Sequence, residues 1–354
     1  MVFRKTHWSA AALCTALVAN AVSAEPVFQT PTQVPAARSA LATRVTFNAL
    51  AMAGGRMVVA GQRGHILLSE DGAAWKQAQV PVSSDLTALS FPTPNEGWAV
   101  GHEGVILHTS NGGESWDRRL DGKQAAALIL KAYGTPGRTD DPAAQRLKVD
   151  AEAFAAQGAD KPFLDVWFED SEKGFAIGAF NLILRTEDGG KTWTPWLDRI
   201  DNPKGLHLYA VRRAGGAVFI VGEQGLVLKL DREGQRFVNV PLPYQGTLFG
   251  VVGTKAVTVV FGLRGNALRS TDGGATWARV DTGVNAGLAS GLVRPDGAIV
   301  LVSQAGDVLL STDDGASFAR VKVANAAPTF AVAQQGKGTL ALAGVGGVRL
   351  QQVK

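Results

Sequence analysis

Residues 262–277, GLRGNALRSTDGGATW, contain the two motifs that recur along this chain. The first is a Gly-x-x-Gly turn between two apolar runs, and the second is a Ser/Thr-x-Asp-x-Gly-x-x-Trp box. The turns, three of them degenerate, begin at positions 61, 101, 178, 222, 262, 303 and 344, with steps of 40, 77, 44, 40, 41 and 41 residues. A period near 40 residues with several short strands per unit is typical of a β-propeller blade.

Each repeat reads as four short strands, because residues of alternating polarity are separated by Gly, Asn and Asp. One unit gives strands at 86–91, 97–100, 105–109 and 117–120. The last unit, from Phe330 to Val353, contains only three strands and no box. The segment from Val27 to Val34 is predicted to supply the missing strand, which would remove an exposed sheet edge. The sequence therefore predicts an all-β protein with seven blades in a single domain, residues 25–354.

The first 24 residues have the pattern of an export signal. Arg4 and Lys5 precede an apolar stretch, and Val22-Ser23-Ala24 forms a small-residue cleavage site. The apolar stretch is too short for a transmembrane helix. Since the single cysteine, Cys14, lies in this segment, the mature chain would contain no thiol. We expect an exported protein of the periplasm or an equivalent extracytoplasmic lumen, with no transmembrane segment in the mature chain.

The charge of the chain does not favour a nucleic-acid partner. The formal net charge is +4, and it falls to +2 when Arg4 and Lys5 are removed. No long run of Lys and Arg is present. A nucleic-acid-binding protein usually carries such a basic patch or stripe.

The 77-residue step contains an insertion, residues 121–161, between the second and third blades. Asp140-Asp141-Pro142 offers an N-cap followed by proline in the first helical turn, and residues 143–157 continue without a helix breaker. Residues 124–133 are also helix-like, so the sequence predicts a helical hairpin. Two interpretations remain open. The hairpin is either padding packed on its own blades or a binding element carried by a rigid scaffold.

The boxes are interpreted as structural elements. In a tight turn the Ser/Thr hydroxyl and the Asp carboxylate accept backbone N–H groups, and Gly takes a positive φ. The aromatic residue would then pack between neighbouring sheets. The carboxylate spacing of a calcium loop is absent. A weak copy ends at Phe237, and the box residues singled out in the other copies are Asp71, Trp75, Asn111, Trp116, Asp188, Trp193, Asp272, Trp277, Asp313 and Phe318.

The paired VGxxGxIL and STDGGxTW motifs resemble those of the BNR-repeat propellers. Among these, the chain is similar to the photosystem II assembly and stability factor family of exported seven-bladed proteins. The resemblance covers about Phe47 to the C-terminus, with the insertion as a departure. It implies a non-catalytic propeller that binds a protein client and assists the assembly or stability of a membrane protein complex.

A sialidase-like glycoside hydrolase or a carbohydrate-binding propeller is the alternative, because sialidases share the box. Their chemistry needs an arginine cluster, a Tyr nucleophile paired with Glu, and an acid/base Asp. The chain contains three tyrosines, and Tyr209 with Arg212 or Glu223 is the combination that would fit. A purely structural or ligand-sensing module is a third possibility.

Metal and cofactor sites are not predicted. The mature chain keeps His65, His102, His108 and His207, and none of them has HxH or HExxH spacing. His65 and the His102-Glu103 pair fall at turns of adjacent blades, where solvated or hydrogen-bonded side chains are the simpler interpretation. No Gly-rich dinucleotide fingerprint stands between a strand and a helix.

Propeller geometry selects one face as the candidate binding surface. The Gly-x-x-Gly turns join the second and third strands, so they emerge on the same side as the interblade connections and the insertion. The boxes fall on the opposite side. Mixed charged, amide and aromatic groups suit a polypeptide partner. The protein is expected to bind this partner as a monomer. The predicted partner-binding residues are Gln62, Arg63, His102, Glu103, Phe180, Asn181, Glu223, Gln224, Arg264, Asn266, Gln304 and Asp307.

Overall fold

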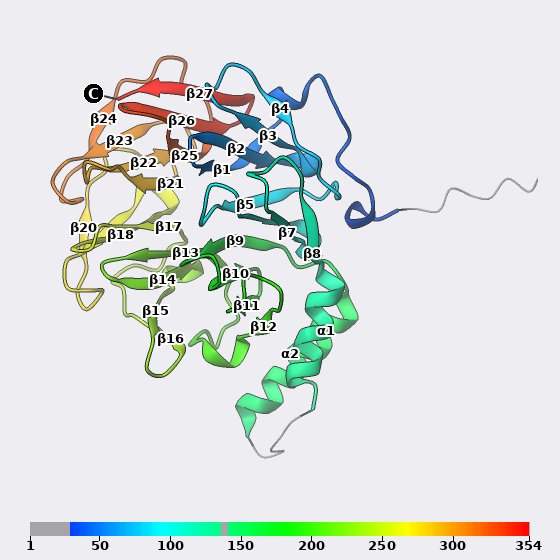
Figure 1. The fold of residues 1–354 in the computed structure, drawn as a ribbon. Helices are drawn as coiled ribbons and strands as arrows, with labels where there is room; N and C mark the ends of the chain where they lie inside the picture. Colours follow the sequence, from blue (N-terminus) through cyan, green and yellow to red (C-terminus); the bar gives the residue numbers. More distant parts are fainter. Residues whose placement is uncertain (1–28, 136–140, 354) are drawn as a thin grey trace, which may run out of the picture.

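The computed structural model describes residues 29–135 and 141–353. Within these ranges the chain forms seven antiparallel sheets around a central axis (Figure 1). This arrangement confirms the predicted seven-bladed propeller. The predicted export signal, residues 1–24, lies outside the described residues. None of the described helices is long and apolar enough to cross a membrane.

Within each blade the strands follow one another from the central axis outward. The first blade contains β1 (Phe47–Ala53), β2 (Arg56–Gly61), β3 (Ile66–Ser69) and β4 (Lys76–Gln77). The second contains β5 (Leu86–Ser90), β6 (Gly97–Gly101), β7 (Ile106–Thr109) and β8 (Asp117–Leu120). The third contains β9 (Phe163–Phe168), β10 (Gly174–Gly178), β11 (Ile183–Thr186) and β12 (Thr194–Pro195). The fourth blade contains β13 (Leu208–Ala214), β14 (Ala217–Gly222), β15 (Val227–Asp231) and β16 (Arg236–Asn239), and the fifth contains β17 (Leu248–Val252), β18 (Thr258–Gly262), β19 (Ala267–Ser270) and β20 (Ala278–Val280). The sixth blade contains β21 (Leu288–Val293), β22 (Ile299–Ser303), β23 (Val308–Ser311) and β24 (Ala319–Val321). The seventh contains β25 (Thr329–Gln334), β26 (Thr339–Gly344) and β27 (Gly347–Gln352).

Short 3-10 helices interrupt the connections. Three of them lie at Pro31–Gln33 (η1), Ala42–Arg44 (η2) and Leu197–Arg199 (η5). The others lie inside Gly-x-x-Gly turns, at Gln62–Gly64 (η3), His102–Gly104 (η4), Glu223–Gly225 (η6) and Leu263–Gly265 (η7).

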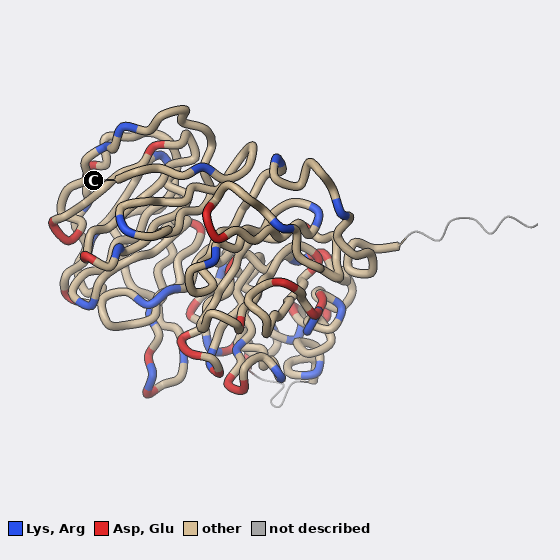
Figure 2. The backbone as a smooth tube through the Cα atoms, turned by 45° about the horizontal axis from the view of Figure 1, so that its top comes forward, with Lys and Arg blue, Asp and Glu red and all other residues tan. Residues whose placement is uncertain are grey.

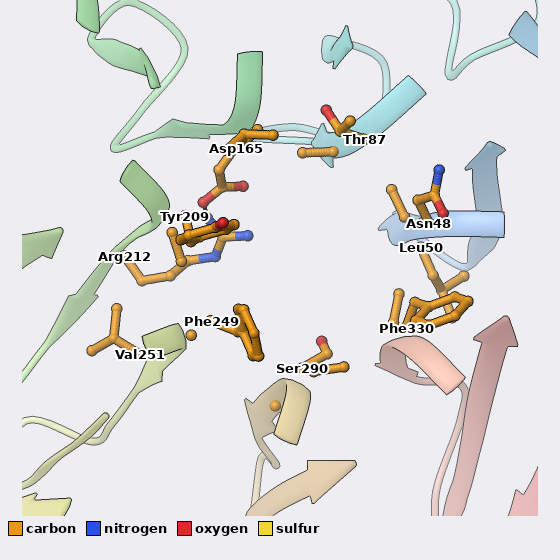
Figure 3. Close-up of a pocket in the computed structure, with 18 of the residues that line it drawn as sticks. Asn48, Leu50, Thr87, Asp165, Tyr209, Arg212, Phe249, Val251, Ser290 and Phe330 are labelled. Atoms are coloured by element: carbon orange, nitrogen blue, oxygen red, sulfur yellow. Dashed lines mark hydrogen bonds and ion pairs between the residues drawn. The ribbon is translucent and has the colours of Figure 1, made fainter. Parts of the chain in front are cut away.

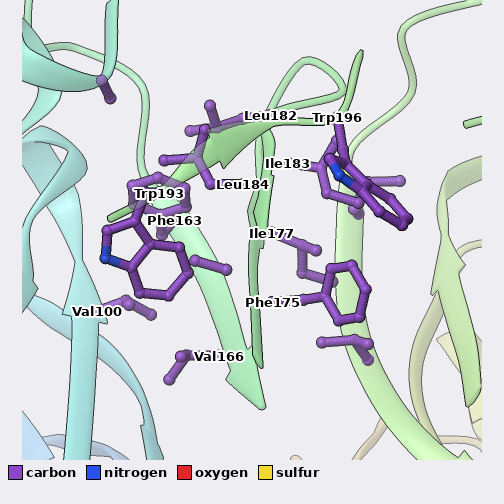
Figure 4. Packing of buried hydrophobic residues seen from close by; sticks show 14 of the residues in the cluster. Val100, Phe163, Val166, Phe175, Ile177, Leu182, Ile183, Leu184, Trp193 and Trp196 are labelled. Atoms are coloured by element: carbon purple, nitrogen blue, oxygen red, sulfur yellow. The ribbon is translucent and has the colours of Figure 1, made fainter. Parts of the chain in front are cut away.

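The third blade shows why alternating apolar residues produce this fold. Phe175 and Ile177 project from one face of β10, while Val166 and Leu184 lie on the other face of the sheet (Figure 4). The Phe175 ring centroid lies 5.3 Å from that of Phe237 in the fourth blade. Both faces of the sheet are therefore buried against neighbouring blades, and apolar burial of this kind is the main stabilising term in folding.

The insertion is a hairpin of two helices, α1 (Gly122–Tyr133) and α2 (Pro142–Gln157), as predicted between the second and third blades. Asp121 caps α1 in a capping box with Gln124, and Asp141 caps α2 by accepting the N–H of Ala143 at 3.0 Å. Asp140 lies outside the described residues. Buried side chains of α1, among them Ile129, belong to the same core cluster as the third blade. The hairpin is therefore packed on the propeller.

The ring closes differently from the prediction. The described part of the predicted closing strand, from Gln29 onward, contains the 3-10 helix η1 and pairs with no sheet. The carbonyl of Pro31 accepts the Ser83 N–H at 2.8 Å, which holds this segment beside the first interblade connection. Proline also has no N–H to donate to a ladder. The last blade keeps three strands, and Phe47 of β1 packs in one core cluster with Ala331 and Ala343 of that blade.

Candidate functional site

The Gly-x-x-Gly turns pack against the connections that lead to the next blade. A Cβ added at Gly64 would lie 2.1 Å from the Val82 carbonyl oxygen, and one added at Gly265 would lie 1.9 Å from that of Val284. The turn of the second blade contacts the start of α1 in the same way, through Gly104 and Gly122. Turns, interblade connections and the base of the hairpin therefore form one surface, called the turn face below.

Five of these turns hold a non-glycine residue at positive φ. Values of 52–55° occur at Arg63, Glu103, Phe180, Gln224 and Arg264. Positive φ is uncommon for residues with a side chain and is a strained state for a bulky one. The same backbone conformation thus presents one side chain per blade on the turn face, and four of the five are exposed.

The structure places most of the predicted partner-binding residues at the surface of these turns. The exposed residues are Gln62, Arg63, His102, Phe180, Gln224, Arg264 and Gln304, and the half-buried ones are Glu103, Asn181, Glu223 and Asn266. Asp307 departs from the prediction because it is buried. Its carboxylate accepts the Ser303 hydroxyl at 2.6 Å and pairs with Arg320. Asp307 is therefore occupied within its own blade.

The charged groups of the turn face differ in how they are engaged. Glu223 accepts the backbone N–H of His207 at 2.9 Å. Asn266 is held by Leu263 and Arg279 at 2.8 Å each. Within the described ranges, the guanidinium groups of Arg63 and Arg264 form no ion pair. Figure 2 shows basic and acidic residues interspersed along the chain, so these two arginines act as local charges and not as part of a large basic region.

A groove of about 540 Å³ lies between α2 and the third blade. We call it the insertion groove, and its lining residues include Arg146, Asp150, Phe154, Gln157, Lys161, Phe180, Asn181 and Lys204. The sequence predicted Phe180 and Asn181 but missed the others. Lys204 and Arg146 come from distant parts of the chain, and no local pattern places them together. The sequence signal that could have indicated this groove was the proline near the start of α2, because α2 forms one wall of the groove.

A β-bulge occurs at the same place in the innermost strand of every blade. In each blade the register shifts after the first strand residue, so that the second one has no partner. Such bulges re-aim side chains. The seven bulged residues are Asn48, Thr87, Leu164, Tyr209, Phe249, Ala289 and Phe330, and all of them line the central cavity (Figure 3), called here the channel mouth. All seven are half-buried.

Tyr209 and Arg212, the pair that a sialidase-like site would use, both line the channel. Arg212 pairs with Asp165, whose pKa is raised by its burial, and this carboxylate also accepts the Val211 N–H at 2.8 Å. Burial and the charge of Glu223 raise the pKa of Tyr209. An activated nucleophile needs the opposite shift. Among the described residues lining the channel, Arg212 is the only arginine, so the arginine cluster of a sialidase is not assembled there.

The boxes form closed hydrogen-bond networks within their own turns. Ser270 donates its hydroxyl to Asp272 at 2.8 Å and accepts the Gly274 N–H at 2.9 Å. Asp272 also accepts the N–H of Thr276 at 2.9 Å, and Trp277 donates its indole N–H to Gly274 at 3.1 Å. A backbone N–H of the same turn is likewise accepted by the side chain of Asp71, Asn111, Asp188 and Asp313. Their carboxylate or amide oxygens are thus used inside the turn.

Glycines of the boxes also touch the preceding blade. A Cβ at Gly190 would lie 2.1 Å from the Trp98 ring, and one at Gly72 would lie 2.9 Å from Leu350 of the last blade. Trp116 and Trp193 are buried, whereas Trp75, Trp277 and Phe318 are half-buried.

Acidification is expected to weaken the box of Asp272. Hydrogen bonds from the Thr276 side chain and backbone, and from Ser270, lower the pKa of Asp272 to about 2 from its ordinary value of 3.8. A carboxyl whose pKa is depressed on folding stabilises the protein above its unfolded pKa and loses that contribution as pH falls through the folded one. The free energy of unfolding should therefore fall between pH about 4 and about 2. Denaturant titrations of the wild type and Asp272→Asn test this, since the variant should lose less over this window.

Within the parts of the chain that the structure describes, no three His, Cys, Asp or Glu side chains gather as a metal site. His65 donates its Nδ1–H to the Gln62 carbonyl at 2.9 Å, and His108 pairs with Glu96 at 2.6 Å. Burial lowers the pKa of His108 despite that carboxylate. These two histidines are therefore engaged in local contacts.

The family described as Photosynthesis system II assembly factor YCF48 matches residues 40–132 and 153–321. The unmatched residues 133–152 belong to the helical hairpin. The Photosystem II assembly lipoprotein Ycf48 of Synechococcus sp. (strain CC9902) is 27% identical over 118 residues, 32% of this chain and 35% of that protein. The Photosystem II stability/assembly factor HCF136, chloroplastic, of Cyanidioschyzon merolae (strain NIES-3377 / 10D) is 48% identical over 50 residues, 14% of this chain and 11% of that protein. The matches thus span only 35% and 11% of these two relatives' own lengths.

A solved structure of YCF48 bound to D1 peptide has the same fold. Its TM-score is 0.63 at 17% sequence identity, over 88% of this chain and 94% of that one. The repeated turns and boxes, the seven-bladed ring and the family match over most of the chain lead to one conclusion: the protein belongs to the photosystem II assembly factor YCF48 family.

Proposed function

We propose that this protein is a non-catalytic scaffold that binds a polypeptide client on its turn face and assists the assembly or stability of a membrane protein complex. The observation that carries the proposal is the turn face itself. Left-handed turns present Arg63, Phe180, Gln224 and Arg264 to solvent on the side where the hairpin stands. The opposite side holds the boxes, whose polar groups are used inside their own turns.

The relatives support a binding role. One is called a stability/assembly factor and the other an assembly lipoprotein, and the similar YCF48 structure contains a bound D1 peptide. The pattern of residues 1–24 and the name lipoprotein of one relative support an extracytoplasmic location. A monomer is the proposed state. Hydrolysis is disfavoured because Arg212 pairs with Asp165 and Glu223 accepts the His207 backbone.

Arginine suits this surface for a physical reason. Its planar guanidinium donates two parallel hydrogen bonds to a carboxylate and also stacks on aromatic rings. Arg63 and Arg264 occupy the same position of their turns, and neither guanidinium forms an ion pair in the described structure, although the Asp85 carboxylate accepts the Arg63 backbone N–H at 2.7 Å. Two such groups on one face provide attachment points for an acidic stretch of client.

Reversing both charges is expected to weaken client binding. The double variant Arg63→Glu, Arg264→Glu should lower capture of the membrane client more than about tenfold, a loss of about 1.4 kcal/mol. Thermal stability should stay within the range of about ±0.5 kcal/mol that surface changes produce. The measurement is affinity capture from detergent-solubilised membranes at physiological salt, with bound proteins quantified by mass spectrometry.

The matched control is Lys191→Glu with Arg236→Glu, which makes the same change of charge on the opposite side, in the turn before β12 and at the first residue of β16. It should capture the client as the wild type does. Full capture by the turn-face variant, or an equal loss in the control, would show that the turn face does not bind the client.

A further inference from the structure

We propose that an aromatic track crosses the turn face from the insertion groove to the channel mouth and binds an extended, acidic client segment through its apolar side chains. The track consists of Phe180, His207, Tyr209 and Phe249. This inference rests on the proposed function, because it names the subsite and the chemistry of the client segment. The observations that carry it come from four blades or connections and from the hairpin.

The four rings are consecutive neighbours. The ring centroids of Phe180 and His207 are 4.6 Å apart, those of His207 and Tyr209 are 6.5 Å apart, and those of Tyr209 and Phe249 are 5.4 Å apart. The first and last pairs are edge-to-face, a favoured geometry for aromatic contacts. The Phe180 N–H donates to Nδ1 of His207 at 3.0 Å, which fixes the imidazole. The track is therefore a connected and partly solvent-accessible row.

Phe180 occupies a position that polar residues hold in other blades. The corresponding residues are Arg63, Glu103, Gln224 and Arg264, all at positive φ. Phenylalanine has no polar group with which to support such a turn. Nevertheless, it adopts φ 55° and remains 53% exposed. A strained, exposed aromatic residue on a rigid turn is the type of side chain that anchors a partner.

Figure 3 shows Tyr209 and Phe249 on one side of the channel mouth, with Arg212 beside Tyr209, and Asn48 with Phe330 on the other side. Asn48 donates to the Leu86 carbonyl at 3.0 Å, and Thr87 donates to the Phe163 carbonyl at 2.8 Å. These groups are used to link adjacent blades. Tyr209 and Phe249 present half-buried rings, and the described structure contains no hydrogen-bond partner for the Tyr209 hydroxyl. The bulges thus turn unsatisfied aromatic surface toward the opening.

The cations beside the track favour an acidic segment, although Glu223 lies beside His207 and both Asp150 and Asp160 line the groove. The ammonium of Lys204 in the insertion groove contacts only the Gln224 amide oxygen, at 3.3 Å, and no carboxylate among the described residues pairs with it. Lys161 lies 5.0 Å from the centre of the Phe180 ring and pairs with Asp160. With Arg63 and Arg264, the turn face therefore offers three cations without an acidic partner. Complementary charge steers and orients a binding partner.

An extended segment fits this layout better than a compact ligand. Successive side chains of an extended chain point in opposite directions, so alternate residues can face the rings while the others remain near the cations. The groove of about 540 Å³ gives one end of the track a concave wall. Arg146 and Asp150 of that wall lie in residues 133–152, which the family match omits. The groove end is therefore where this chain selects its own client.

Peptide binding to the purified mature chain tests the track. The probes are short labelled peptides measured by fluorescence anisotropy. One alternates aspartate and phenylalanine, the second has serine in place of phenylalanine, and the third has lysine in place of aspartate. The first should bind most tightly, and Phe180→Ser and Tyr209→Ala should each weaken its binding about tenfold or more, as loss of an interface anchor does. Leu41→Ser, an exposed apolar residue beside the last blade, is the matched control and should leave binding unchanged.

Thermal melting monitors the fold of each variant. Should Tyr209→Ala unfold, the exposed Phe180→Ser still decides the question. Equal binding of the serine and phenylalanine peptides overturns the track, and so does binding by Phe180→Ser that matches Leu41→Ser. Membrane capture that responds to the arginine reversal but not to Phe180→Ser also rejects the track and leaves the proposed function standing. If the proposed function is wrong, the arginine reversal leaves membrane capture unchanged. The peptide measurements still test the track in that case.

Discussion

Replacing Trp98 by alanine is expected to lower the free energy of unfolding by about 3–5 kcal/mol, the usual cost of truncating a buried aromatic residue. Trp98 lies in β6 of the second blade and is only 2% exposed. Its ring stacks on Phe168 with centroids 4.9 Å apart and meets the edge of Trp193 at 5.9 Å. Both partners belong to the third blade, so a single side chain fills much of this interface.

Denaturant unfolding of the two proteins measures the loss. Trp75→Ala is the matched control, because Trp75 is a half-buried tryptophan of the first blade. It should cost clearly less than Trp98→Ala, since it removes less surface from a packed environment. Equal losses in the two variants would mean that the interface between the second and third blades is not packed as described.

Replacing Gly265 by alanine should be the second most damaging change. Gly265 has φ +70°, where a side chain costs about 1–2 kcal/mol. In addition, the new Cβ would lie 1.9 Å from the Val284 carbonyl oxygen, so the backbone of the next connection would have to move. We expect a loss of more than about 2 kcal/mol, because the clash adds to the conformational cost.

The control for this change lies in the same connection. Gly283 has φ +66° and nothing within 4 Å of an added Cβ, so Gly283→Ala carries the conformational cost without the clash. The difference between the two variants, measured by denaturant unfolding, isolates the close approach of turn and connection. Indistinguishable losses would contradict the packing of the Gly-x-x-Gly turn on the next connection.

The sequence predicted the fold well because its signals are local and repeated. Each turn and box indicates a blade from residues that are close together in the sequence. Asp141-Pro142 likewise indicates the start of α2. Ring closure was predicted wrongly because strand pairing between chain ends depends on competing contacts. The segment around Pro31 finds its partner in Ser83 and not in the last sheet.

The candidate site was less predictable. The position of a turn shows which residues lie on the turn face but not which other groups contact their side chains. Asp307 was wrongly predicted to bind a partner, because Arg320 and Ser303 bury its carboxylate. The aromatic track depends on Tyr209 and Phe249 being aimed by bulges in two separate blades. No pattern within one repeat indicates that these rings are connected to Phe180 through His207.

Closure by packing alone has a consequence for the order of folding. Phe47 of the first blade is buried against Ala331 and Ala343 of the last, and among the described residues no strand crosses from one of these blades to the other. Contacts between residues so far apart in sequence form late, because the intervening chain must first lose its freedom. The apolar side of the first blade therefore remains exposed to solvent until the last blade has been synthesised. In a chain that stopped one blade short, that side would stay exposed permanently.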